Sequence, residues 1–229
     1  MKKLLIILFL YISTLNLHAA VRDSKHTYDR DYSLFPQTDY TDLYSNQLKT
    51  IFPSSYCFQS VMFIPREEMK GYPCKEVLNK LDQMGGLDKE CSGVCYTDGH
   101  TGKLKPIFKK SSYDEIEHEL YVKDKAAGGL YLKVDVDEHV EKTTIYSVMA
   151  VLNKTPDNIF LQGIKKNEAC IFVFLEETEE GANLYVLIQT KFSPLKMKFV
   201  KKIVENAVSA RVIELQNWFY RMICTPQNQ

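Results

Sequence analysis

Between Cys91 and Lys191 the hydrophobic and polar positions of the chain alternate with a period of two, which is typical of β-strands. The clearest stretch runs from Leu130 to Val136, where every second residue is aliphatic and the residues between are Tyr, Lys and Asp. Turn-forming pairs such as Asp98-Gly99 and Gly128-Gly129 separate the stretches. This region therefore predicts a meander of antiparallel strands.

Three stretches, residues 145–152, 170–175 and 184–188, are apolar on both faces. Such strands must be covered on both sides, or one side must line an internal space. An earlier run, from Tyr56 to Ile64, predicts the first strand of the domain. The segment that begins at Pro73 and ends at Gly85-Gly86 predicts a short helix, because Pro favours a first turn and Gly ends a helix.

The last segment, from Pro194 to Ile223, predicts a long amphipathic helix of about 45 Å. On a helical wheel the expected inner side consists of Val200, Val204, Ala207, Val208, Leu215, Trp218, Phe219 and Met222. The expected outer side carries Lys202, Asn206, Ser209, Ile213, Gln216 and Tyr220.

The order of these elements predicts an α+β domain over residues 55–224, in which a curved antiparallel sheet of about six to seven strands wraps a long C-terminal helix. By element order it resembles the helix-grip, or START-like, layout. That resemblance implies a cavity between sheet and helix.

Before this domain, residues 1–20 read as a signal peptide, with Lys2 and Lys3, a short apolar run, and Ala19 and Ala20 as a cleavage site. The apolar run is shorter than the about 20 residues that a membrane span needs. We therefore expect a periplasmic or secreted protein. Residues 21–54 are polar and Tyr-rich and predict a loosely attached arm.

Composition narrows the class of protein. Removal of Lys2 and Lys3 with the signal peptide leaves 27 of the 29 basic residues against 29 acidic ones. A balance near zero does not favour a nucleic-acid binder, which needs a concentrated basic face.

The six cysteines of an exported chain favour some disulfides, of undetermined pairing. Cys91 and Cys95 lack two further ligands at ordered spacing, so we predict no metal site and no cofactor.

Arg211 is the most informative polar residue, because it falls in the apolar stripe of the predicted last helix. A guanidinium is always charged and cannot stay there unpaired. It either binds an anionic headgroup or carboxylate of a ligand, or has a structural role, as a pair with a strand carboxylate or as a side chain that extends its charge to solvent. The predicted binding residues are Val204, Val208, Arg211, Leu215, Trp218 and Phe219.

The sequence contains no Gly-x-Ser-x-Gly or His-Glu-x-x-His spacing that would predict a hydrolase. His118 and His139 are expected in strands with neighbouring carboxylates, which point to opposite faces and make no compact acid–base pair. We therefore predict a protein that is not an enzyme.

Two stretches, LDQMGGLDKECSGVCYTDGHTGKLKPIFKKS at residues 81–111 and the run at residues 184–223, resemble an uncharacterised family of exported spirochaete proteins. That family contains a domain of unknown function. The resemblance implies a periplasmic sheet-and-helix domain and supplies no catalytic residue.

Two functional hypotheses follow. The first is a binding protein that holds a hydrophobic or amphipathic small molecule, with lipids among the candidates, between sheet and last helix. The second is a cavity-free interaction or envelope-structural protein that contacts a protein partner through the arm. Its contact surface would consist of Tyr28, Tyr32, Tyr40, Tyr44 and Tyr56. The alternative for these tyrosines is that they pack the arm onto the domain.

Overall fold

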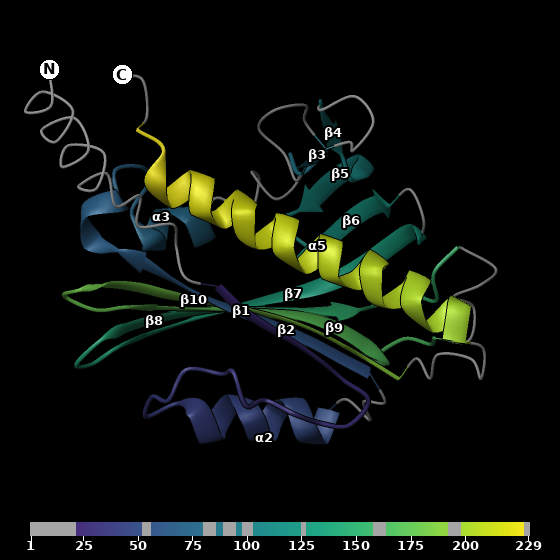
Figure 1. The fold of residues 1–229 in the computed structure, drawn as a ribbon, viewed down its shortest axis with the longest axis horizontal. Coiled ribbons are helices and arrows are strands. Elements are labelled where there is room, and N and C mark those ends of the chain that lie inside the picture. The colour runs from purple at the N-terminus through teal and green to yellow at the C-terminus, as the bar shows by residue number, and fades with distance from the viewer. Residues whose placement is uncertain are drawn as a thin grey trace, which may run out of the picture.

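The computed structural model describes residues 22–51, 56–79, 86–88, 95–97, 103–124, 127–157, 164–191 and 198–226. The predicted signal peptide, residues 1–20, and the turn at Asp98-Gly99 lie outside these residues. Figure 1 shows a sheet with the long C-terminal helix on one face and the N-terminal segment with a shorter helix on the other.

The helices and strands follow one another in an order close to the predicted one. They are β1 (Arg22–Thr27), α2 (Thr41–Ile51), β2 (Tyr56–Pro65), the 3-10 turn η1 (Arg66–Glu68), α3 (Cys74–Asn79), β3 (Cys95–Thr97), β4 (Leu104–Pro106), β5 (Phe108–Asp114), β6 (Glu119–Asp124), β7 (Gly128–Val140), β8 (Thr144–Leu152), β9 (Ala169–Glu177), β10 (Gly181–Thr190) and α5 (Lys198–Cys224).

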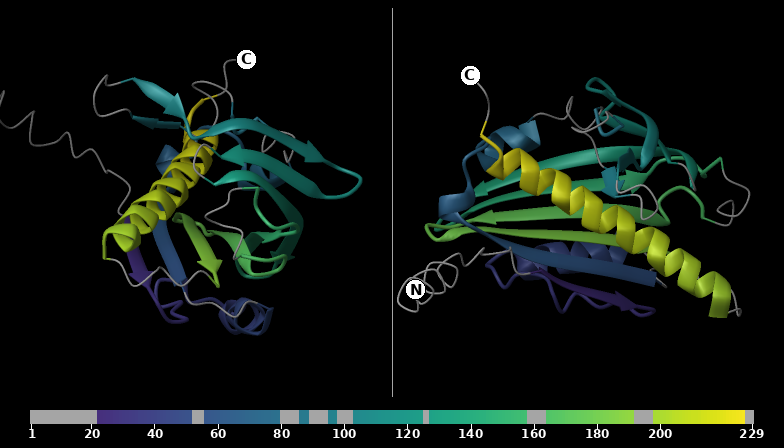
Figure 2. Two further views of the ribbon diagram at one scale, coloured as in Figure 1. Left: turned by 90° about the vertical axis from the view of Figure 1, so that its right-hand side faces the viewer. Right: turned by 45° about the horizontal axis from the view of Figure 1, so that its top comes forward.

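The main sheet has eight strands in the order β1-β2-β10-β9-β8-β7-β6-β5, and each neighbouring pair is antiparallel. The predicted meander is confirmed for β5 to β10. The last strand, β10, then pairs with β2 along its whole length, from Gly181 opposite Pro65 to Thr190 opposite Tyr56. Figure 2 shows that the sheet curves around α5, so that β5 and β6 rise beside the helix.

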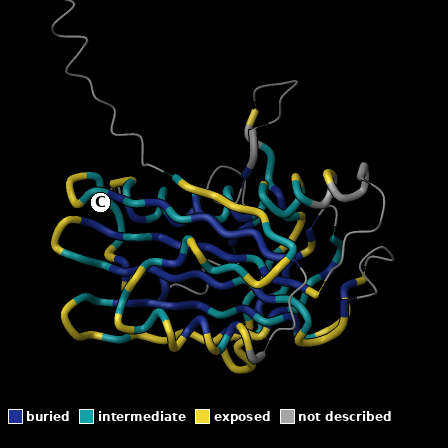
Figure 3. The backbone as a smooth tube through the Cα atoms, turned by 60° about the horizontal axis from the view of Figure 1, so that its bottom comes forward, coloured by how far each residue is buried: buried dark blue, intermediate teal, exposed yellow. Residues whose placement is uncertain are grey.

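The strands with two apolar faces are covered on both sides. In β9, Phe172 and Phe174 belong to the core beneath the N-terminal segment, whereas Val173 and Leu175 belong to the core beneath α5. Because successive side chains of a strand point to opposite faces, one strand contributes to two separate cores. Figure 3 shows the result: the buried stretches run through the middle of the strands and the exposed ones gather at the turns and the outer edge.

The N-terminal segment is part of the fold and not the loosely attached arm that we predicted. Its first residues form β1, which pairs with β2 from Arg22 opposite Met62 to Thr27 opposite Cys57. Its later residues bury Phe35, Tyr44 and Leu48 against the sheet, and their residual exposures are 1 to 3%. A single apolar residue every few positions was enough to bury this polar segment, because the sheet supplies the remaining apolar surface.

The tyrosines of this segment turn inward. The Tyr32 hydroxyl donates to Gln189 of β10 at 2.5 Å, and the Tyr44 hydroxyl accepts from Ser147 of β8 at 3.0 Å. Tyr40 stacks on His139 with 4.3 Å between ring centroids. Tyr32 and Tyr44 therefore pack the segment onto the domain, whereas the Tyr40 hydroxyl donates to Glu141 at an exposed position.

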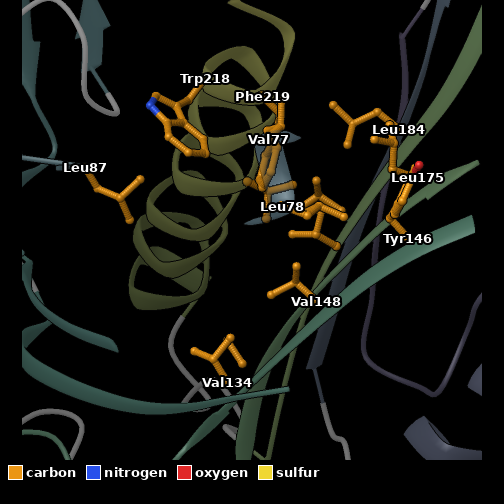
Figure 4. Close-up of a cluster of buried hydrophobic side chains, with 14 of the residues drawn as sticks. Val77, Leu78, Leu87, Val134, Tyr146, Val148, Leu175, Leu184, Trp218 and Phe219 are labelled. Carbon is orange, nitrogen blue, oxygen red and sulfur yellow. The ribbon is translucent and has the colours of Figure 1, made fainter. Parts of the chain in front are cut away.

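Helix α5 confirms the predicted C-terminal helix, but its buried side is rotated from the expected one. Val212, Gln216, Phe219 and Ile223 are each fully buried at 0% exposure. Gln216, which we expected on the polar side, is buried because its amide finds partners in the sheet. Figure 4 shows Trp218 and Phe219 packed with Val77 and Leu78 of α3 above the strands.

The expected disulfides are not present among the described cysteines. Cys57, Cys74, Cys95, Cys170 and Cys224 are free thiols, and Cys91 lies outside the described residues. Cys57 and Cys170 both pack beneath the N-terminal segment, but each pairs with Gln189 of the strand between them. Two strand spacings amount to about 9.5 Å, which is too far for a disulfide bond.

Candidate functional site

A cavity of about 170 Å³ lies between α5 and the strands β6 to β10. Its exposed wall is apolar. Strand residues make up most of the wall, and two loops add Ala127, Pro156 and Ile164. The lining residues are Tyr56, Phe108, Val122, Asp124, Ala127, Leu130, Leu132, Leu152, Pro156, Ile164, Ala169, Cys170, Ile171, Ile188, Thr190, Val208 and Arg211.

A second, smaller cavity of about 50 Å³ continues the first toward the C-terminal end of α5. Its wall is also apolar and includes Leu215 and Phe219 of the helix. The two cavities have four lining residues in common, namely Phe108, Val122, Leu132 and Ile171. They are therefore two chambers separated by a thin layer of side chains.

Arg211 forms a bidentate ion pair with Asp124, the last residue of β6. Its Nε donates to Asp124 Oδ2 at 2.6 Å and its Nη2 donates to Asp124 Oδ1 at 2.7 Å. The third nitrogen, Nη1, donates to the carbonyl of Ala207 at 2.6 Å. The Asp124 side chain is only 1% exposed, whereas that of Arg211 is 22% exposed. The paired geometry neutralises both charges at the wall of the larger cavity.

Asp124 is held in place from its other side as well. Its Oδ1 also accepts the backbone N–H of Ala127, in the turn between β6 and β7. An aspartate that binds the backbone three residues on is a common turn-forming arrangement. The turn thus fixes the carboxylate, and the carboxylate fixes the guanidinium of α5.

The structure brings most of the predicted binding residues to these chambers. Val208 and Arg211 line the larger one, and Leu215 and Phe219 line the smaller one. Trp218 lines neither; it is 2% exposed and packs edge-on against Phe219. Val204 lies in α5, but its side chain is outside the part of the structure that can be described.

Sequence reasoning missed the strand side of the site and the partner of Arg211. We expected a strand carboxylate as one of two alternatives, without identifying which. The signal was present, because Asp124 ends a strand and precedes the Gly128-Gly129 turn. From sequence alone, a carboxylate at such a position is interpreted as an exposed turn residue, because the helix that covers it is distant in the chain.

Tyr56 closes one end of the larger cavity. Its hydroxyl lies 2.9 Å from Nδ1 of His26 in β1, and its ring is fully buried. Burial lowers the pKa of His26, so the imidazole is neutral at neutral pH. Burial also raises the pKa of the Tyr56 hydroxyl. This end of the site therefore contains two uncharged polar groups that bind each other.

The other histidines lie away from the cavity. His118 sits in the turn before β6 with a φ of 48°, rather than in the strand that we expected, and its Nδ1 lies 3.2 Å from the Tyr113 hydroxyl. His139 lies in β7 and stacks on Tyr40. Among the described residues, no group of three or more His, Cys, Asp or Glu side chains comes together in a metal-binding arrangement.

No protein-family model and no curated protein sequence matches the chain. Among solved structures, the chain is similar to the crystal structure of Ara h 8.0201, with 12% identity and a TM-score of 0.35 over 71% of this chain and 96% of that one. Within the described part of the chain, we find no helix that combines the length and the apolar character needed to cross a membrane.

Proposed function

We propose that the protein is a non-enzymatic binding protein that holds a hydrophobic small molecule between its sheet and α5, in a helix-grip layout. The observation that carries the proposal is the cavity of about 170 Å³ with an apolar wall. An apolar cavity of about 150 Å³ in another protein stays dry and binds benzene, so this one is large enough for a small guest.

The volume of the cavity also narrows the range of hydrophobic and amphipathic ligands that the sequence suggested. Pockets for drug-sized molecules measure about 300 to 1,000 Å³, well above either chamber. The volume therefore holds a compact guest completely, whereas a lipid with long acyl chains would extend beyond it. The competing hypothesis of a cavity-free interaction protein gains no support from the inward-facing tyrosines of residues 22–51.

We propose further that the protein is exported, and that it belongs to the exported spirochaete family that residues 81–111 and 184–223 resemble. Cleavage after Ala19 or Ala20 would leave β1 intact, since that strand begins at Arg22. Intact-mass analysis of the protein from periplasmic and culture fractions tests the export proposal. A mature chain that starts at residue 20 or 21 is expected, and a full-length chain in the cytoplasm would contradict it.

Two variants on the same helix test the binding function. Val208 lines the larger chamber, and Val208→Phe is expected to fill it and to abolish binding of toluene, measured by NMR chemical-shift changes. Ile213→Phe is the matched control, because Ile213 is partly buried on α5 and lines neither chamber. Native mass spectrometry of the protein purified from cells, followed by solvent extraction, checks for a guest that co-purifies. Equal toluene binding by both variants, or none by the unmodified protein together with no co-purified guest, would refute the proposal.

A further inference from the structure

We infer that the guest is uncharged, and that Arg211 serves as a neutralised part of the cavity wall rather than as the binding partner of a carboxylate or phosphate. This inference rests on the proposed binding function and specifies the chemical class of its ligand. It also decides between the two roles that the sequence left open for Arg211.

The first argument is the hydrogen bonding of the pair. Each of the three guanidinium nitrogens of Arg211 has an acceptor, with Asp124 receiving two of the bonds and the Ala207 carbonyl the third. Both oxygens of Asp124 receive a donor from Arg211 in return. The charge that would attract an anionic guest is therefore already balanced in the protein without a ligand.

The second argument is the cost of replacing Asp124. An anion that took its place on Arg211 would leave a carboxylate whose side chain is 1% exposed without its counter-ion. Such a buried charge is strongly unfavourable, and the turn bond from Ala127 holds Asp124 where it is. An anion that entered without displacing Asp124 would meet an apolar surface on the residues that the structure describes around the cavity.

The third argument is the shape of the space. The chambers of about 170 and 50 Å³ meet at Phe108, Val122, Leu132 and Ile171. A compact hydrocarbon ring fits the larger chamber, and a small apolar substituent can point toward the smaller one. Both chambers have apolar walls, so the preferred guest is a compact hydrocarbon without a charged group.

The test compares three probes that share one ring: toluene, benzoate and benzylammonium. At pH 7 we expect toluene to bind and each charged probe to bind about 100-fold more weakly or not at all, because a charge loses its hydration in an apolar cavity. Chemical-shift changes at Val208 and Phe108 would locate the guest. Benzoate that binds as tightly as toluene, or more tightly, would overturn the inference while leaving the binding function intact.

A variant of Asp124 tests whether its negative charge is what keeps Arg211 from binding an anion. Asp124→Asn keeps an oxygen for the Ala127 turn but removes the charge that neutralises Arg211. We expect this variant to bind benzoate at least about 10-fold more tightly than the unmodified protein does. Unchanged benzoate binding in a folded variant would contradict the neutralising role of Asp124. If the variant fails to fold, the three-probe comparison on the unmodified protein still tests whether the site prefers an uncharged guest. Failure of all three probes, with no co-purified guest, would remove the binding function itself.

Discussion

Gln216 of α5 and Ser60 of β2 form a hydrogen bond of 2.9 Å at a place where both residues are fully buried. The amide nitrogen of Gln216 also donates to the carbonyl of Leu184 in β10 at 2.9 Å. This contact links the helix to two neighbouring strands and sets the rotation of α5 about its axis. The face of the helix that reaches the cavity depends on that rotation.

The first prediction concerns this contact. Gln216→Met removes the side-chain hydrogen bonds of Gln216 at similar volume, including the amide donor to the Leu184 carbonyl. We therefore expect a loss of about 1 to 3 kcal/mol in the free energy of unfolding. Urea denaturation measures it. Asn206→Ala, an exposed change on the same helix, should stay within about 0.5 kcal/mol. A loss no larger than that of the control would show that the buried amide contributes nothing to stability.

The second prediction concerns the unequal exposure of the pair between Arg211 and Asp124. Arg211→Met removes the guanidinium that balances the charge of a buried carboxylate, so we expect it to lower the free energy of unfolding by about 3 to 5 kcal/mol. Asp124→Asn should lower the free energy of unfolding by less, because the Arg211 side chain is 22% exposed and water can solvate its charge. The double variant should be more stable than Arg211→Met alone, which a thermodynamic cycle from urea denaturation would show. Equal losses from the two single variants would contradict this account.

The third prediction concerns the N-terminal segment. Phe35 is 3% exposed and contacts the rings of Phe172, Phe174 and Tyr185. Phe35→Ala is therefore expected to destabilise the whole domain by about 3 to 5 kcal/mol, as a large core truncation does. Leu43→Ala is the control, since Leu43 is 48% exposed in the same segment. If thermal denaturation of the two variants gives the same midpoint, the segment is not part of the cooperative fold.

The fourth prediction uses the thiols beneath that segment. Burial raises the pKa of Cys57 to about 12, so the reactive thiolate is scarce at pH 8. Iodoacetamide should label Cys57 and the fully buried Cys170 only after unfolding, whereas the half-buried Cys224 should react sooner. Peptide mass mapping over time checks the order. Rapid labelling of Cys57 in the native protein would mean that the segment opens readily.

The fifth prediction concerns acid. The ion pair with Lys25, at 2.5 Å, is the main reason that the pKa of Asp31 is lowered from 3.8 to about 2. A carboxylate with a lowered folded-state pKa stabilises fully above its unfolded value and loses that contribution as the pH falls toward the folded one. Urea midpoints should therefore fall between pH 4 and 2 by less in Asp31→Asn than in the unmodified protein. Identical pH profiles would show that the pair does not contribute.

The sequence was sufficient for the elements whose pattern is local. The period of two at residues 130–136 and the long amphipathic run before Cys224 each identify an element, because a strand or helix with a buried side imposes that period on its own residues. The apolar character of β8, β9 and β10 on both faces also predicted either a covering on each side or an internal space on one side. It did not predict that the N-terminal residues would provide the second one.

Only the tertiary structure determined which polar residues pair with each other across the fold. Asp124 meets Arg211, and Ser60 meets Gln216, over separations of 87 and 156 residues. The sequence around a polar residue does not indicate which distant group it will pair with, so we expected Gln216 on the exposed side and did not identify Asp124. The cavity likewise depends on the tertiary structure, because an unfilled volume results from how the sheet and the helix pack together and not from any one segment.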